Sequence, residues 1–311
     1  MKNVALALSS GGPRGFAYIG AIEELQSRGY TITSVAGASA GALVGGIFAA
    51  GGLDSFKEWL FGLDPVKVMT LMDFSVSKNY LVKGDKVINA IKEVVPEVNI
   101  EDLPIPFTAI ATDLYTGEEV IFREGPLFDA IRASISIPSM FRPVKWKGRT
   151  LVDGGMVNTF PLNRVQRTPG DILVGFNVNQ IDAGEIQGFL DSRAALLQER
   201  DALPLMGRIA TDLQALRLQM DGRENRLPVN AANTFSTILQ RSFGIMNCTI
   251  ARMGLGLNPP DVLASLPMDS YHGVYGYSHA REIAQKGRDL MAQALDEYEN
   301  RQQGKRKRYC S

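Results

Sequence analysis

The chain has 311 residues, of which 45% are hydrophobic and 21% charged, so it is long enough to bury a sizeable core. Its 33 basic and 33 acidic residues cancel, which excludes bulk electrostatic attraction as a route to nucleic acid. The two cysteines (Cys248, Cys310) and two histidines (His272, His279) exclude a disulfide scaffold, an iron–sulfur cluster and a histidine-rich metal site, so we expect no metal and no cofactor.

In the first half of the chain, short apolar runs that predict strands alternate with helical patterns. Residues 4–8 predict a strand, and residues 16–28 follow with the spacing of an amphipathic helix. A second strand at 32–36 precedes a helix of small residues at 39–50. Further along, we expect a largely helical region at 56–95, a helix starting at 128–134, and strands at 107–112, 119–122, 150–152 and 172–177. This alternation predicts an α/β fold with a mostly parallel sheet covered by helices on both faces.

The second half of the chain is mostly helical in pattern. Amphipathic stretches cover residues 184–227, and helices are expected at 235–253 and 280–298. No internal repeat or low-complexity linker divides the sequence, which favours a single domain. The expected organisation is one domain at 1–300, with its motifs in 1–180 and a helical insertion or lid at about 184–253, and a flexible basic tail at 301–311.

The longest apolar stretch, from Ala36 to Leu53, does not have the composition of a membrane span. Glycine and serine residues interrupt it throughout, so it is expected to be a buried helix. The apolar run at residues 4–8 is too short for the core of a signal peptide. We therefore expect a cytoplasmic protein, with peripheral association with a membrane as an open alternative.

The segment from Gly37 to Gly41 has the pattern Gly-x-Ser-x-Gly and lies between an expected strand and an expected helix. A sharp turn between strand and helix exposes a serine hydroxyl, and small neighbours let the backbone bend without collision. The helix that follows would place its positive end where negative charge develops. The context favours Ser39 as a nucleophile over the alternative that these small residues only allow close packing.

A glycine-rich loop follows the first expected strand, with the sequence Ser10-Gly11-Gly12-Pro13-Arg14-Gly15. Successive glycines allow several backbone N–H groups to point at one place, which suits an oxyanion or a phosphate. The loop lacks the Lys-Ser/Thr of a P-loop and a full GxGxxG pattern. On these residues alone, a simple tight turn is as well supported as an anion site.

The base that a serine nucleophile requires is less clear from the residues themselves. The order Ser39, Asp153, His272 is that of an α/β-hydrolase triad, but too few strands precede Ser39 for that fold. Asp153 is then the best placed acid. Viewed alone, however, Asp153-Gly154-Gly155 between two apolar pairs favours a β-hairpin turn.

Taken together, these motifs resemble those of the patatin-like phospholipases over residues 1–180. The glycine loop with its arginine, the Gly37–Gly41 segment, a Ser-x-Ser-x-Pro segment at 134–138 and the Asp-Gly-Gly at 153–155 occur in the family's order. Residues 111–118 are also similar to the family's sequence. Ser10 departs from it, because the family has glycine at this place, and residues 184–270 carry no assignable motif.

The resemblance implies a patatin-like three-layer α/β/α sandwich with a helical C-terminal region, and a catalytic dyad of Ser39 and Asp153 without histidine. Ser39 would attack an ester carbonyl, while Asp153 would take its proton and return it to the leaving alcohol. The implied oxyanion hole contains Gly11, Gly12, Arg14 and Gly15, and the implied supporting residues are Gly37, Ala40, Gly41, Ser134, Pro138, Gly154 and Gly155.

The resulting functional hypothesis is a serine acyl hydrolase that acts on lipid esters, either phospholipids or lysophospholipids. An acyltransferase is the first alternative, because an alcohol or thiol acceptor can discharge the same acyl-enzyme in place of water. A nucleotide-binding regulatory module is less favoured, since residues 31–35 offer no acidic ligand for a ribose. No nucleic-acid partner is expected.

Overall fold

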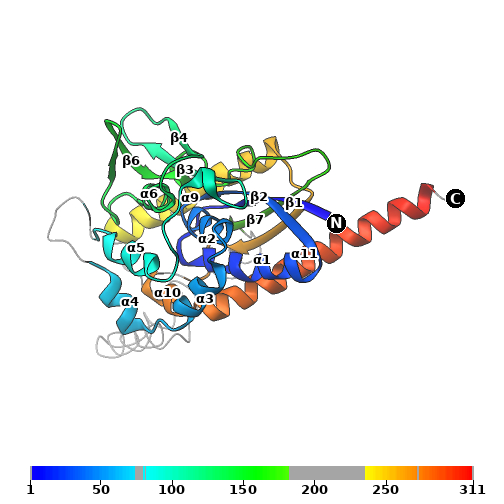
Figure 1. Cartoon of the computed structure of the whole chain (residues 1–311). Coiled ribbons are helices and arrows are strands. Elements are labelled where there is room, and N and C mark those ends of the chain that lie inside the picture. Colours follow the sequence, from blue (N-terminus) through cyan, green and yellow to red (C-terminus); the bar gives the residue numbers. More distant parts are fainter. Residues whose placement is uncertain (1, 74–79, 81, 182–234, 272, 310–311) are drawn as a thin grey trace, which may run out of the picture.

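The computed structural model describes residues 2–73, 80, 82–181, 235–271 and 273–309, and its centre is one eight-stranded sheet (Figure 1). The strand order is β5-β6-β3-β2-β1-β7-β8, and β4 pairs with β3 outside this path. The strands are β1 (Lys2–Leu8), β2 (Tyr30–Ala38), β3 (Phe107–Asp113), β4 (Glu119–Phe122), β5 (Val144–Trp146), β6 (Arg149–Asp153), β7 (Ile172–Gln180) and β8 (Val262–Pro267).

The sheet is parallel at its centre and antiparallel at one edge. β3, β2, β1, β7 and β8 pair in parallel, whereas β4 and β6 run antiparallel to β3, and β5 runs antiparallel to β6. The predicted mostly parallel sheet is therefore confirmed. Sequence analysis missed β5 and β8. β5 has only three residues, too few for a periodic pattern, and β8 is recognised through its pairing with β7.

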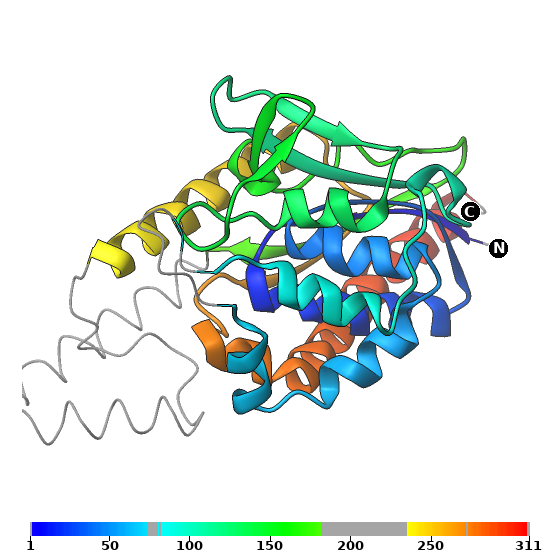
Figure 2. The ribbon, with the colours of Figure 1, turned by 60° about the vertical axis from the view of Figure 1, so that its left-hand side comes forward.

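Helices cover both faces of the sheet, which confirms the three-layer arrangement. Views from two directions place α1, α2, α3 and α11 on one side of the sheet and α9 on the other (Figures 1 and 2). Among the described residues, the helices of four or more residues are α1 (Ala17–Ser27), α2 (Ala40–Ala49), α3 (Leu53–Phe61), α4 (Pro65–Leu71), α5 (Asp85–Lys92), α6 (Leu127–Ser134), α9 (Phe235–Leu257), α10 (Gly273–Ser278) and α11 (Ala280–Tyr309), together with the 3₁₀ helix η1 (Gly12–Phe16).

The alternation of side chains along β1 divides them between two hydrophobic clusters. Val4, Leu6 and Leu8 belong to the main core with α1, α2 and α11, whereas Ala5 and Ala7 face a smaller cluster that includes Ala251 of α9. Successive residues of a strand point to opposite faces, so the small residues define one face.

The structure bears on two expectations about the helices. The region at 56–95 contains three short helices, α3, α4 and α5, and not one continuous helical stretch. In the stretch 301–311, expected to be a flexible basic tail, α11 continues to Tyr309, and its last turns extend away from the body (Figure 1). Apart from Gly304, residues 301–308 are helix formers or tolerate helix, and no proline stops it.

The expected helices at 184–227, and most of the expected insertion or lid, lie outside the described residues. Among the helices that the structure describes, none combines the length and the hydropathy that crossing a membrane requires.

Candidate active site

The register of three strands brings Ser39 and Asp153 to the same edge of the sheet. Ala38, the last residue of β2, pairs with Ile110 of β3. The next residue of β3, Ala111, pairs with Asp153, the last residue of β6. Because β6 runs antiparallel to β3, its carboxyl end returns to the place where β2 ends. Residues that are 114 positions apart in the sequence therefore meet beside one strand.

Ser39 lies at a strained turn between β2 and α2. Its φ of 52° and ψ of −120° fall in a region that residues with a side chain rarely adopt, and such strain is typical of functional turns. Gly37 and Gly41 make the turn sterically feasible. A Cβ on Gly37 would lie 2.3 Å from the carbonyl of Gly41, and a Cβ on Gly41 would lie 2.3 Å from the carbonyl oxygen of Leu8. The hydroxyl of Ser39 is thus held by its backbone at the start of a helix.

Ser134, the last residue of α6, supports this turn directly. The Ser39 N–H donates to Ser134 Oγ at 2.8 Å, and Ser134 Oγ donates to the carbonyl oxygen of Ile110 at 2.5 Å. The first serine of the Ser-x-Ser-x-Pro segment therefore ties the backbone of Ser39 to β3. Pro138 lies in the turn that follows, and it takes no part in these hydrogen bonds.

The second serine of that segment supports Asp153 through the backbone. The Asp153 N–H donates to the carbonyl oxygen of Ser136 at 2.9 Å. Arg132 holds Ser136 in place, because its Nη1 donates to Ser136 Oγ at 2.7 Å. Arg132 is buried. In the sequence, its support of Ser136 could have been suspected only from a charged residue two positions before the Ser-x-Ser-x-Pro segment. Sequence analysis did not single it out.

Asp153 is buried and only partly satisfied. Its Oδ1 accepts a hydrogen bond from the Gly155 N–H at 2.7 Å, and the residue as a whole is 4% exposed. Within the described part of the chain, Oδ2 has no hydrogen-bond partner of standard geometry, although the Ser39 hydroxyl is near enough to affect the carboxyl group. One carboxylate oxygen is therefore available to a proton from Ser39.

The environment of Asp153 makes it a stronger base than an aspartate in water. Burial raises its pKa to about 6, against the lowering effects of the Ser39 hydroxyl and the Gly155 N–H. A carboxyl group has a low proton affinity when solvated, and desolvation raises it. At neutral pH Asp153 is ionised but close to its pKa, which suits a general base.

The hairpin turn that Asp153-Gly154-Gly155 favoured in isolation is not formed. Asp153 ends β6, and residues Gly154–Met156 form a 3₁₀ helix. The hairpin lies earlier, where β5 and β6 are joined through Lys147 and Gly148, both at positive φ. Gly154 has a different purpose, because a Cβ there would lie 2.1 Å from the carbonyl oxygen of Ile110. It allows Asp153 to approach β3.

The glycine loop presents backbone donors at the same edge. Within the described residues, the N–H groups of Gly11 and Gly12 donate to no other group. The loop also packs against the start of α2, where a Cβ on Gly15 would lie 2.4 Å from that of Ala40. The first N–H groups of a helix have no partner within it, so Ala40 adds a donor beside Ser39 that sequence analysis treated only as support.

Ser10, the departure from the family pattern, does not alter these donors. Its N–H is already used, since it donates to the carbonyl oxygen of Thr159 at 2.8 Å. Its hydroxyl oxygen lies 2.6 Å from the place that a Cβ on Gly155 would occupy. Ser10 therefore packs under Asp-Gly-Gly and leaves Gly11 and Gly12 as the residues with available N–H groups.

Arg14 anchors the loop through its side chain. Its Nε donates to the carbonyl oxygen of Val178 at 3.0 Å, and its Nη1 donates to that of Met268 at 2.8 Å. Burial lowers the pKa of the guanidinium, which nevertheless remains charged at any ordinary pH. The Arg14 side chain thus joins the glycine loop to the ends of β7 and β8, and it places a positive charge beside that loop.

The two histidines do not complete a triad among the described residues. His272 lies outside them, and His279 Nδ1 lies 3.2 Å from Ser278 Oγ at the start of α11. No group of three or more histidine, cysteine, aspartate or glutamate side chains is placed to hold a metal in the part of the chain that the structure covers.

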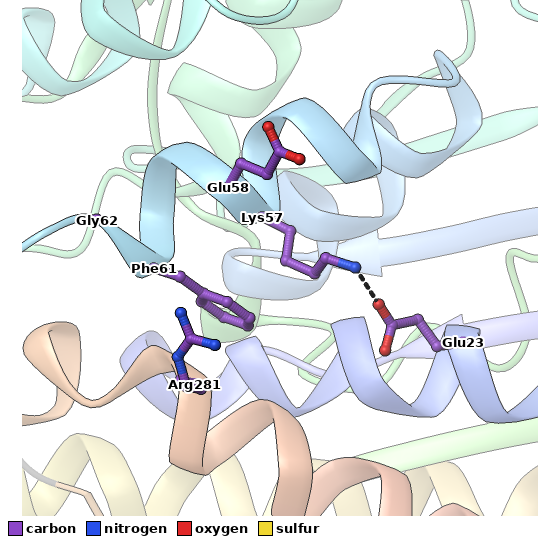
Figure 3. Close-up of a pocket in the computed structure, with 6 residues that line it drawn as sticks. All are labelled: Glu23, Lys57, Glu58, Phe61, Gly62 and Arg281. Carbon is purple, nitrogen blue, oxygen red and sulfur yellow. Dashed lines mark hydrogen bonds and ion pairs between the residues drawn. The ribbon is translucent and has the colours of Figure 1, made fainter.

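A surface cavity of about 500 Å³ lies away from Ser39 and Asp153, between α1, α3 and the start of α11 (Figure 3). Lys57 and Glu23 form an ion pair across it at 2.6 Å, and the guanidinium of Arg281 lies over the Phe61 ring at 4.9 Å. Acidic and basic side chains both line the cavity, and Lys57 and Glu23 already neutralise each other. It is therefore a poorer candidate for chemistry than the edge that holds Ser39.

Comparison with known proteins agrees with the motifs. The family described as patatin-like phospholipase matches residues 6–165. An uncharacterized NTE family protein of Mycobacterium tuberculosis is 35% identical over 332 residues, which cover 95% of this chain and 92% of that protein. A patatin-like phospholipase domain-containing protein of Caenorhabditis elegans is 30% identical over 200 residues, covering 62% of this chain and 15% of that one.

A comparison of structures finds VipD from Legionella pneumophila, with a TM-score of 0.46 and 15% sequence identity. The match covers 96% of this chain and 67% of that one.

Proposed function

Because the chain belongs to the patatin-like phospholipase family, we propose that it is a serine hydrolase of lipid esters that works through a dyad of Ser39 and Asp153. Family membership supports lipid acyl hydrolysis in general. The observation that carries the finer proposal is the pairing of a serine at a strained strand-to-helix turn with a buried carboxylate, one oxygen of which has no hydrogen-bond partner among the described residues.

In the first half-reaction, Ser39 Oγ attacks the ester carbonyl carbon as Asp153 Oδ2 takes the hydroxyl proton. The carbonyl oxygen becomes an oxyanion, and the N–H groups of Gly11, Gly12 and Ala40 donate hydrogen bonds to it. The bond to the alcohol then breaks, and the protonated Asp153 returns its proton to the leaving oxygen. An acyl group remains on Ser39, and the net charge of the site is unchanged.

The second half-reaction repeats these steps with water. Asp153 takes a proton from water as the water oxygen attacks the acyl carbonyl carbon. The bond between that carbon and Ser39 Oγ then breaks, Asp153 returns the proton to Ser39 Oγ, and the fatty acid leaves. The pKa of about 6 suits both roles, because the carboxyl group must accept and release a proton in each cycle. A single buried aspartate therefore replaces the histidine and aspartate of a triad.

A fluorophosphonate probe tests the nucleophile, since it forms a covalent bond with an activated serine Oγ. We expect one adduct, on the peptide that contains Ser39, and none in Ser39→Ala. His279→Ala is the matched control and should be labelled at the rate of the unmodified protein. An adduct at another residue, or undiminished ester turnover by pure Ser39→Ala, would show that the nucleophile is wrong.

A panel of phospholipids and lysophospholipids with graded acyl chains then tests the substrate class, with release of free fatty acid as the measurement. Addition of an alcohol acceptor separates hydrolysis from acyl transfer. We expect the fatty acid to remain the main product. A dominant acylated acceptor would instead assign the acyltransferase alternative, with the same dyad.

A further inference from the structure

A tyrosine from the C-terminal part of the chain lies on the glycine loop. Tyr277 belongs to α10, and its hydroxyl oxygen lies 3.9 Å from the place that a Cβ on Gly12 would occupy. Gly12 has no side chain and a φ of 58°, so the tyrosine hydroxyl is close to the backbone that carries the proposed oxyanion donors. More than 260 residues separate the two in sequence.

The rest of α10 holds this hydroxyl in position. The ring of Tyr277 packs edge-on against Phe16, at a centroid distance of 5.9 Å, directly after the loop. A Cβ on Gly276 would lie 2.7 Å from the Pro13 side chain, so the helix backbone packs against the loop itself. Both contacts orient the ring independently of its hydroxyl group.

The hydroxyl of Tyr277 is a free donor in a charged surrounding. Among the described residues it has no hydrogen-bond partner, in contrast to Tyr18, whose hydroxyl donates to the Ser9 carbonyl oxygen at 2.6 Å. Burial raises the pKa of Tyr277 to about 12, and the Asp153 carboxylate raises it further, whereas Arg14 lowers it. The group therefore keeps its proton at neutral pH and is near enough to Asp153 to sense its charge.

We propose that Tyr277 Oη donates a hydrogen bond to the carbonyl oxygen of the ester as it becomes an oxyanion, beside the N–H groups of Gly11 and Gly12. The inference rests on the proposed function, because it needs an oxyanion at this loop. A neutral donor that is already oriented stabilises developing charge without reorganisation. The C-terminal module thereby supplies a catalytic residue to a site otherwise built from residues 11–155.

The test uses Tyr277→Phe in the full-length chain, since phenylalanine keeps the ring contact with Phe16 and removes only the hydroxyl. We expect kcat for ester hydrolysis to fall by about 10- to 100-fold, at or below the roughly 100- to 1,000-fold loss on removing one oxyanion-hole donor, because the backbone donors remain. KM and the melting temperature should change little. The acid limb of the pH profile should stay where Asp153 places it.

Tyr30→Phe is the matched control. Tyr30 starts β2, at the end of that strand opposite Ser39, and its hydroxyl donates to Glu299 Oε1 at 2.8 Å. Loss of the Tyr30 hydroxyl group should lower the melting temperature slightly and leave kcat unchanged. The comparison separates the loss of a hydroxyl group as such from the loss of a hydroxyl group at the site.

A trifluoromethyl ketone provides the second measurement, because Ser39 Oγ adds to its carbonyl carbon and the oxygen becomes an oxyanion. We expect its affinity for Tyr277→Phe to fall by the same factor as kcat/KM. Unchanged kcat and unchanged ketone affinity in folded Tyr277→Phe would overturn the role of Tyr277 alone. If the unmodified protein neither turns over esters nor reacts at Ser39 with a fluorophosphonate, the proposed function itself fails.

Discussion

The edge of the sheet that holds Ser39 and Asp153, here called the catalytic edge after its proposed role, is built by close approach of backbone to backbone. A Cβ on Gly154 would lie 2.1 Å from the Ile110 carbonyl oxygen, and one on Gly41 would lie 2.3 Å from that of Leu8. A carboxylate is buried in the same place. Geometry is set there by atoms that have no freedom to move aside.

The surface where α1, α3 and α11 meet, here called the α3–α11 face, is built from long side chains (Figure 3). Glu23 accepts from Lys57 at 2.6 Å and from Arg288 at 2.7 Å, and all three side chains are partly exposed. Water competes for such ion pairs, so each contributes little. The contrast shows that burial and rigidity decide how much a contact contributes, and that the presence of an ion pair does not.

The largest expected effect is on activity at the catalytic edge. Ser39→Ala and Asp153→Asn should each lower kcat by more than about 1,000-fold, because the two groups act as one unit and either loss stops proton transfer. The double variant should be no slower than the worse single variant. Steady-state hydrolysis of a chromogenic ester measures all three, and independent, multiplicative losses would contradict the dyad.

The next effect is on folding. Gly154→Ala should reduce the free energy of unfolding by about 3 kcal/mol or more, since the added methyl group overlaps a carbonyl oxygen of a central strand. Gly148→Ala is the control, because no atom lies within 4 Å of a Cβ there, although its positive φ adds a smaller cost. Denaturant unfolding compares them, and equal losses would show that crowding at Ile110 is relieved.

A smaller effect, of opposite sign, is expected from the charge of Asp153. The pKa of this group is raised to about 6 in the folded chain, above the unfolded value near 3.8. Its ionisation therefore destabilises the fold progressively as pH rises from about 4 to about 6, and the full cost remains above that range. Asp153→Asn should gain about 2–3 kcal/mol of stability at pH 8 and nothing below about pH 4.

Unfolding of both proteins across this pH range measures that difference. A gain independent of pH would mean that folding does not shift the pKa of the carboxyl group. The same pKa predicts that kcat/KM falls as pH decreases through about 6, because the protonated base cannot accept the proton of Ser39.

The smallest effect is expected at the α3–α11 face. Lys57→Met removes one of the two cations on Glu23 and should reduce the free energy of unfolding by less than about 1 kcal/mol, with activity unchanged. Thermal unfolding at low and high salt checks this, and salt should narrow the difference. A loss of activity would reveal a link between the two regions that the described contacts do not contain.

Local features of the sequence were sufficient for the framework of this protein. The alternation of short apolar runs and helical patterns predicted the parallel centre of the sheet, because each strand and helix has its own periodicity. The turn at Ser39 was also local, since Gly37 and Gly41 stand within two residues of it. The order of four motifs pointed to the family, which the comparisons show.

Contacts between distant segments decided the remainder. From its own residues, Asp153-Gly154-Gly155 favoured a hairpin turn, and only the pairing of β6 with β3 places the carboxylate beside Ser39. The raised pKa of Asp153 comes from burial, which no neighbour in sequence supplies. Arg132 and Tyr277 reach the site through packing of α6 and α10. Sequence thus determined which groups could react, and tertiary structure determined which of them meet, because proximity and desolvation arise only when remote segments pack together.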